Sequence, residues 1–221
     1  SSLFILKFKL TRHGVESILR LPDMKDETQI TAMSLFMNLW MPAYSCNLNL
    51  MQFLPILMVN TSLKYGNCNI SSLGYATLGM LLGYGMGDFE SGYRLGALSK
   101  ELNEKYMNTG FNCTLNFMMG AFLIHWKEHA RNDIEYLVRA YRCGIATGDL
   151  YYSRLTGIMH AGAMMMKGDN LNNVLTVAFE YLDYTTKGKN IQQRPHGGDT
   201  VRLAASGKDK KRRKPWGREF R

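Results

Sequence analysis

A small residue returns at an interval of 41 positions inside three apolar segments of this chain. The three positions are Gly79, Gly120 and Ala161. Glycine inside a helix costs about 1 kcal/mol relative to alanine, so a recurring small residue there indicates close approach of a neighbouring helix. A fixed period of roughly 20 to 50 residues is typical of helical repeat arrays. The spacing therefore predicts an all-α chain, a TPR-like antiparallel array of helix hairpins (an α-solenoid).

Apolar residues recur with helical spacing over most of the chain. One stripe contains Ile134, Leu137, Val138, Tyr141 and Ile145, a pattern that places all five on one helix face. Similar stripes predict three helix hairpins, at about residues 70–107, 112–147 and 150–186. Two further helices are predicted at about 27–45 and 48–65, with a short helix at 14–21.

Glycines mark the expected ends of these helices. Gly66, Gly110, Gly148 and Gly188 recur at intervals of 38 to 44 residues, and each is expected to end the second helix of a pair.

Within each pair a second signal is expected to separate the two helices. Gly87–Asp88 and Gly168–Asp169 combine a glycine that ends one helix with an aspartate that caps the next. Lys127–Glu128 holds the equivalent place in the central pair, and Asp26 with Gln29 resembles a capping box.

The net charge of +9 belongs to the C-terminal end. From Thr185 onward there are twelve Lys or Arg and three Asp or Glu, whereas residues 1–184 carry fifteen of each sign. The apolar period also stops there, and a charged segment without it is expected to be disordered. We therefore expect an incoming helix end and connector at 1–25, a helical repeat domain at 26–186 and a basic disordered tail at 187–221.

The spacing of the cysteines and the lengths of the apolar stretches indicate in which cellular compartment the protein is expected. Cys46, Cys68, Cys113 and Cys143 form no CxxC pair, which argues against a zinc ribbon or a redox motif. We expect reduced, half-buried thiols in a cytoplasmic protein.

The longest apolar stretch, residues 50–59, is too short to cross a bilayer, so no membrane partner is expected. The chain begins within an apolar run at residues 3–6, and we expect it to be a fragment of a longer protein.

A few residues suggest chemistry, and each also has a plainer interpretation. His125 and His129 have the spacing of two metal ligands on a helix, but Trp126 stands where the metalloprotease pattern needs glutamate. Residues 83–88 (GYGMGD) lack the spacing of a phosphate-binding loop and suit a helix end. His160 and the methionines at 164–166 are expected in the core. We therefore assign no catalytic, cofactor-binding or metal-binding residue, and no cofactor.

A basic run, KDKKRRK, lies at residues 208–214 next to Trp216. Such a run can bind phosphates through counterion release or act as a nuclear localisation signal. A basic run of this kind is also typical of a solvated, unstructured chain end. Nucleic acid is therefore considered as a partner only through the tail.

Several segments, in their order and spacing, resemble one family. They are LPDMKD (21–26), PAY (42–44), MVNTSLKYGN (58–67), GDFESGY (87–93), HWKE (125–128) and AYRCGIATGDL (140–150). The chain over residues 12–184 resembles the TPR-like region of large multidomain signalling proteins. In that family a serine/threonine-kinase-like domain and a STAND (AAA-type) ATPase precede the helical region, and a GAF sensor and a histidine kinase often follow. Those catalytic modules are absent here, so none of their residues can be assigned to this chain.

The resemblance implies a non-catalytic scaffold segment of a signal-transduction ATPase/kinase. Its partners would be adjacent ATPase, GAF or kinase modules, or a separate protein. The alternatives are a stand-alone protein- or peptide-binding repeat module, which would need a groove of convergent polar side chains, and a nucleic-acid binder that uses the tail. An enzyme would need a cluster of titratable residues in a pocket, and the sequence contains no catalytic motif.

Overall fold

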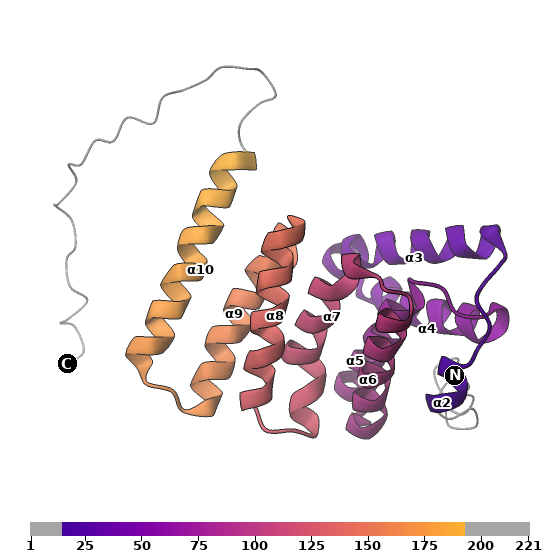
Figure 1. The fold of residues 1–221 in the computed structure, drawn as a ribbon, viewed down its shortest axis with the longest axis horizontal. Coiled ribbons are helices and arrows are strands. Elements are labelled where there is room, and N and C mark those ends of the chain that lie inside the picture. Colours follow the sequence, from indigo (N-terminus) through magenta and orange to yellow (C-terminus); the bar gives the residue numbers. More distant parts are fainter. Residues whose placement is uncertain (1–14, 193–221) are drawn as a thin grey trace, which may run out of the picture.

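The fold is given by a computed structural model that describes residues 15–192. Figure 1 shows its helices in chain order along the long axis of the molecule, with α5 to α10 side by side and α3 and α4 lying across them at one end. The α-helices are α2 (Val15–Leu19), α3 (Glu27–Cys46), α4 (Leu48–Tyr65), α5 (Ser71–Met86), α6 (Phe89–Lys105), α7 (Asn112–Met118), α8 (Arg131–Thr147), α9 (Leu150–Lys167) and α10 (Leu171–Gln192).

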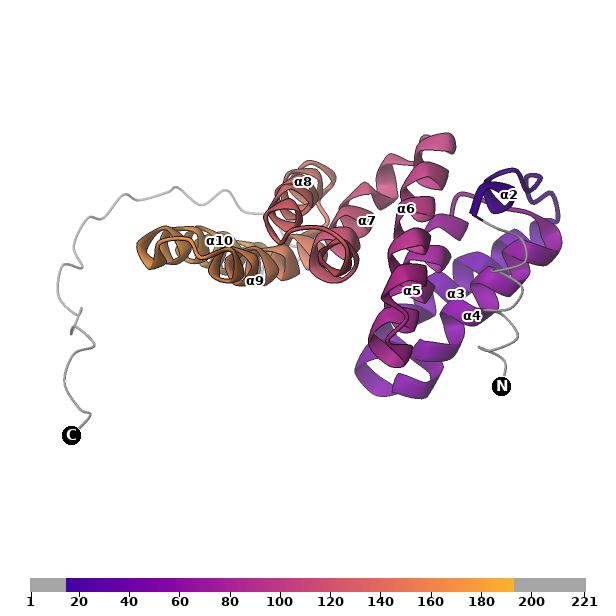
Figure 2. The same cartoon turned by 90° about the horizontal axis from the view of Figure 1, so that it is seen from below.

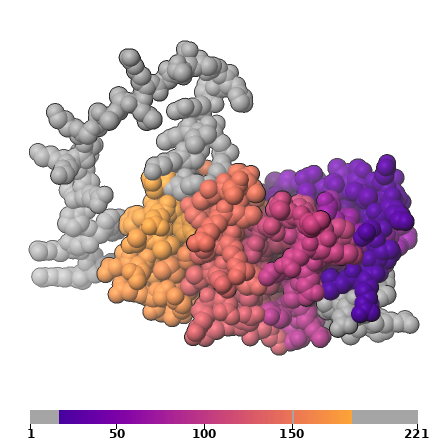
Figure 3. Space-filling view, viewed as in Figure 1, coloured from indigo at the N-terminus to yellow at the C-terminus, as the bar shows by residue number. Residues whose placement is uncertain are grey.

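The helices pair as antiparallel hairpins, which confirms the all-α helix-hairpin array. α3 packs against α4, α5 against α6, α7 against α8, and α9 against α10. Successive hairpins also contact each other, through α4 with α5 and through α8 with α9. Figure 2 shows α9 and α10 in one row with α8 above them, and successive hairpins abut in the space-filling view (Figure 3). In the described part of the chain, β-structure is limited to one bridge between Asp23 and Asn67.

Most of the predicted helix ends are confirmed. Gly66 (φ 99°), Gly87 (φ 68°), Gly148 (φ 75°) and Gly168 (φ 87°) each end a helix with a positive φ that other residues rarely adopt. The predicted aspartate caps at the start of α3 and α6 also form. Oδ1 of Asp26 accepts hydrogen bonds from the backbone N–H of Thr28 and Gln29, and that of Asp88 accepts one from Ser91.

Three predicted ends are wrong. α6 ends at Lys105 and Met107 takes the left-handed conformation (φ 46°), so Gly110 lies in the following 3₁₀ turn instead of ending α6. α10 continues through Gly188 to Gln192, because one glycine costs a long helix only about 1 kcal/mol. Asn170, and not Asp169, accepts the bond from the first turn of α10, while Asp169 pairs with Lys167.

The central hairpin departs from a regular α-helix. After α7 the chain forms a π-helix at Met119–Leu123 and a 3₁₀ turn at Ile124–Trp126. Gly120 therefore lies in the π-helix, in the wider turn that π-helices make. The break expected near Lys127–Glu128 is present, since α8 begins at Arg131.

Two of the three periodic small residues face a neighbouring helix at close range. A Cβ on Gly79 would lie 2.7 Å from the carbonyl oxygen of Gly92 in α6, and one on Gly120 would lie 2.8 Å from that of Asp133 in α8. Ala161 is only half-buried. In the last hairpin the close contact belongs to Gly157, which packs on the ring of Tyr181.

The core runs through the array in two clusters. One lies between α2, α4, α5 and α6 and includes Ile18, Tyr75 and Leu98. The other runs from Met33 in α3 through α5, α7 and α8 to Ala163 in α9. Continuous burial of this kind is what stacked hairpins achieve and a single hairpin cannot.

The first half of α4 exposes some of its apolar residues and buries others. Leu50 and Phe53 in α4 are exposed, Leu57 is half-buried, and Leu54 is buried because it faces the core. The apolar run at residues 3–6 and the basic tail from 193 onward lie outside the described residues. In the part of the chain that was searched, residues 15–192, no helix is long and apolar enough to cross a membrane.

Candidate functional site

Two adjoining hollows lie where α3 and α4 meet α5, the central hairpin and the start of α9. Their volumes are about 360 Å³ and about 400 Å³, and Trp40 and Thr77 line both. We call them together the methionine groove. Its larger side chains are Met37, Trp40, Met41, Tyr44, Met51, Met58, Leu73, Met80, Leu81, Tyr84, Phe111, Met118, Phe122 and Tyr152.

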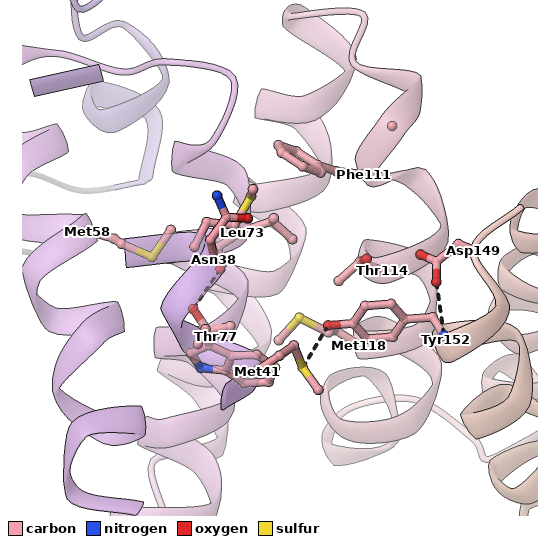
Figure 4. A pocket seen from close by; sticks show the side chains of 13 residues that line it. Asn38, Met41, Met58, Leu73, Thr77, Phe111, Thr114, Met118, Asp149 and Tyr152 are labelled. Carbon is pink, nitrogen blue, oxygen red and sulfur yellow. Dashed lines mark hydrogen bonds between the residues drawn. The ribbon is translucent and has the colours of Figure 1, made fainter. Parts of the chain in front are cut away.

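The lining is apolar and aromatic, with little charge. Six methionines from four helices contribute to it, and Asp149 is the one charged residue among the residues that line the two hollows. Asn38, Thr77 and Thr114 add neutral polar groups to the first hollow. Figure 4 shows Thr114, Asp149 and Tyr152 opposite Asn38, Met58, Leu73 and Thr77. Such a surface can bury the apolar side chains of a ligand and fix its orientation with a few polar contacts.

Hydrogen bonds hold the polar groups of the groove in place. The backbone N–H of Tyr152 donates to Oδ1 of Asp149 (3.1 Å), so the carboxylate caps α9 at the rim. The phenol of Tyr152 donates to Sδ of Met41 (3.7 Å), and the hydroxyl of Thr77 donates to the carbonyl oxygen of Leu73 (2.7 Å) (Figure 4). Burial raises the pKa of Tyr152 well above its usual value, so its phenol stays neutral and remains a donor.

Trp40 forms the wall that the two hollows share. Its ring stacks on Tyr44 with a centroid separation of 6.3 Å. Its Nε1–H is buried and has no hydrogen-bond acceptor among the described residues. An unsatisfied buried donor costs about 1–3 kcal/mol, so a small rotation of this ring that brings Nε1–H to an acceptor on a ligand would be favourable.

The two histidines considered as metal ligands do not form a ligand set. Nδ1 of His125 lies 3.6 Å from Oδ2 of Asp133. His129 lies at the turn before α8, where its Nδ1 accepts a hydrogen bond from the backbone N–H of Arg131 (3.1 Å). Over residues 15–192, no group of three or more His, Cys, Asp or Glu side chains is placed to hold a metal ion.

The core role expected of His160 is confirmed, and that of the methionines after it is confirmed in part. His160 is buried, and its Nδ1 and the hydroxyl of Tyr181 share a hydrogen bond (2.9 Å). Met164 is buried, whereas Met165 and Met166 are exposed, so the expectation that all three fill the core is wrong.

The glycine-rich stretch 83–88 is a helix end, as expected. Gly87 ends α5, and the surface of Gly83 is covered by the ring of Trp126, which also covers Gly92 of α6. The stretch therefore serves helix packing.

The four cysteines are free, but they are not uniformly half-buried as expected. Cys68 and Cys113 are buried, Cys143 is half-buried and Cys46 is exposed. Burial raises the pKa of Cys113 to about 12 and also raises that of Cys143. Both thiols are therefore protonated and unreactive at neutral pH.

Sequence reasoning missed the groove. Its six methionines carry no local sequence signature, because they come from segments far apart in the chain. Comparison with protein-family models, with curated proteins and with solved structures finds no match to this chain.

Proposed function

We propose that this chain is a non-catalytic protein-binding module that holds an apolar segment of another protein in the methionine groove. The observation that carries the proposal is the composition of the lining: methionine and aromatic side chains, with Asp149 as its one charged residue. Methionine is flexible and polarizable, and it is frequent on surfaces that adapt to apolar partners.

The preferred ligand is an amphipathic helix with a basic flank. A helix buries its apolar face in such a groove through residues at i, i+3 or i+4, and i+7. Asp149 at the rim favours a lysine or arginine beside that face. A peptide-binding groove of this kind corresponds to the alternative function considered from the sequence. The groove contains fewer polar side chains than that alternative called for.

Within this role, we propose that the chain acts as a scaffold segment of a cytoplasmic signalling ATPase/kinase, as the sequence resemblance suggests. Two of the segments that carry the resemblance, GDFESGY (87–93) and HWKE (125–128), meet at a contact between hairpins. Tyr93 donates a hydrogen bond to Glu128 (2.8 Å), Lys127 pairs with Glu90, and Phe89 packs on Trp126 (5.3 Å). Such contacts hold neighbouring hairpins together, which supports a scaffold and does not support an enzyme.

Two fluorescein-labelled helical peptides test the groove by fluorescence anisotropy. Both carry a Leu/Met face, and their flanks carry either lysine or glutamate. We expect the lysine peptide to bind more tightly. Met41→Glu places a charge in the groove and should weaken that binding about tenfold or more, a loss of about 1.4 kcal/mol.

Two further variants make the test specific. Asp149→Asn keeps the helix cap, because asparagine caps as well as aspartate, and it should abolish the preference for lysine. Leu35→Glu changes an exposed residue of α3 that does not line the groove and should bind like the unaltered chain. Equal binding by the Met41→Glu variant, or no binding of either peptide, would refute the proposal.

A further inference from the structure

The last hairpin exposes a row of large apolar side chains on each of its two helices. Ile158 and Met165 in α9, and Leu171, Leu175, Phe179 and Leu182 in α10, are each between 53% and 69% exposed. We call these six residues the α9–α10 face. Gly162 lies between the two α9 residues, and a Cβ there would meet nothing within 4 Å.

The two rows point to the same side of the hairpin. On α9, Gly157 and His160 face Tyr181 of α10, while Ser153 packs on Gly144 of α8. A rotation of about 100° per residue turns Ile158 and Met165 away from α8 and onto one side of the hairpin, about 120° from the direction of the α10 contact. On α10, Val174 and Tyr181 face α9, so the same rotation turns Leu175 and Phe179 to that side. The six residues therefore form one continuous surface.

Earlier hairpins of this array carry a helix or turn on the corresponding surface. Trp126, after the π-helix, covers Gly83 of α5 and Gly92 of α6. Ser153 of α9 covers Gly144 of α8, and Tyr152 packs on Phe117 of α7 (5.4 Å). The α9–α10 face is thus shaped to receive a further helix, and none of the described residues provides one.

The exposed area is large for a monomer. The six side chains expose on the order of 600 Å², at the upper end of the largest apolar patches on monomers and close to what each partner gives to a standard interface. We propose that this face binds the same face of a second copy of the chain and forms a two-fold symmetric dimer in which the two α10 helices run antiparallel.

The sequence of α10 is complementary to itself in this arrangement. Leu171, Leu175, Phe179 and Leu182 are spaced by 4, 4 and 3 residues, which gives a stripe along one side of the helix. An antiparallel pair centred near Val177 places Leu175 of each copy opposite Phe179 of the other.

Light scattering after size exclusion, on the full chain, tests the dimer. We expect the unaltered chain to be a dimer at micromolar concentrations. Leu175→Glu and Phe179→Lys should each give a monomer with unchanged helical content by circular dichroism, because each places a charge in an apolar interface. Leu39→Glu, at an exposed site on α3 at the other end of the array, should remain dimeric.

Mixing the two monomeric variants tests the antiparallel pairing. In a mixed dimer the carboxylate introduced at position 175 of one copy lies opposite the ammonium group introduced at position 179 of the other. The second contact of that dimer is the unaltered pair of Leu175 and Phe179, so the dimer mass should return in the mixture alone. A monomeric unaltered chain, growth to open-ended assemblies, dissociation by Leu39→Glu, or no recovery in the mixture would overturn the proposal.

Discussion

Nδ1 of His125 lies 3.6 Å from Oδ2 of Asp133, a carboxylate that is 1% exposed and has no hydrogen-bond partner among the described residues. Asp133 lies in the first turn of α8, where the helix dipole favours an anion. The groups around it are His125 after the π-helix, Glu128 at the turn, and Tyr84 of α5. Burial raises the pKa of Tyr84, and the Asp133 charge raises it further. This pair is therefore a buried titratable site beside the irregular part of the central hairpin.

The first prediction concerns the charge of Asp133. Burial, with a smaller effect of Glu128, raises its pKa from 3.8 to about 6. Because the native state binds this proton more readily than the unfolded chain, the Asp133 contribution favours folding below pH 4 and is lost as the pH rises through 6. Asp133→Asn should therefore raise the free energy of unfolding at pH 8 by up to about 3 kcal/mol, measured by urea denaturation, and should matter little at pH 4.

The titration of His125 changes the free energy of unfolding in the opposite direction over the same pH range. Burial lowers its pKa below 6.5, so its contribution favours folding above that pH and is lost as the pH falls. Because this lowered pKa leaves His125 neutral at pH 8, comparing Asp133→Asn with the unaltered chain at that pH isolates the carboxylate. Glu135→Gln, at an exposed acid on the same helix, should show no comparable gain. A loss of stability at pH 8 in Asp133→Asn would contradict a buried, uncompensated charge.

The second prediction concerns the close contact of the π-helix with α8. A side chain at Gly120 would meet the carbonyl oxygen of Asp133 at 2.8 Å, Cγ of Leu137 at 2.8 Å and Cβ of Tyr136 at 3.0 Å. Gly120→Leu should lower the free energy of unfolding by roughly 1–3 kcal/mol or more, since a packed core resists added volume. Gly162→Ala, in open space on α9, should instead add about 1 kcal/mol through helix propensity. Chemical denaturation of both variants measures the contrast.

The third prediction concerns the glycines under Trp126. A Cβ at Gly83 would overlap the indole ring, whereas one at Gly85, two residues later in the same helix, would meet only Cδ1 of Leu81 at 3.6 Å. Gly83→Ala should therefore lower the melting temperature, and Gly85→Ala should leave it unchanged or raise it. Trp126→Ala should also be destabilising, by up to about 3 kcal/mol, because it removes the ring that packs on Gly83 of α5 and Gly92 of α6. Similar melting temperatures for the two alanine variants would show that Trp126 is not held there.

The array could be predicted from the sequence where the signal is local. Apolar stripes at helical spacing and glycines such as Gly87, Gly148 and Gly168 report backbone conformation directly, and α5, α6, α8 and α9 begin and end within a few residues of the prediction. Gly110 failed as a marker because Met107 adopts the left-handed conformation earlier. Gly188 failed because a helix of 22 residues tolerates one glycine.

What depends on tertiary packing could not be predicted. The π-helix at Met119–Leu123 has no sequence signal of its own, and the groove depends on which faces of α3, α5 and α9 come together. Trp40 and Met41 look in the sequence like any buried residues of an apolar helix. The burial of Asp133 could not be predicted either, because an aspartate near the start of a helix is normally an exposed cap.

The last prediction concerns the basic tail. Because α10 extends to Gln192, a truncated variant that lacks the tail should end after that residue and not near Thr185. Residues 193–221, which lie outside the described part of the chain, contain ten Lys or Arg against three Asp or Glu and no apolar period. From this composition we expect them to bury too little surface to offset the entropy lost on ordering. Removing them should leave the melting temperature of the array nearly unchanged. Any affinity for DNA or RNA should disappear with them, and in the full chain it should fall steeply as salt is raised, because phosphate contacts release counterions. Circular dichroism and filter binding at two salt concentrations measure both effects.

Unfolding of the truncated chain would mean that the tail packs on the array. Salt-independent binding by the truncated chain would place a nucleic-acid site on the helices themselves.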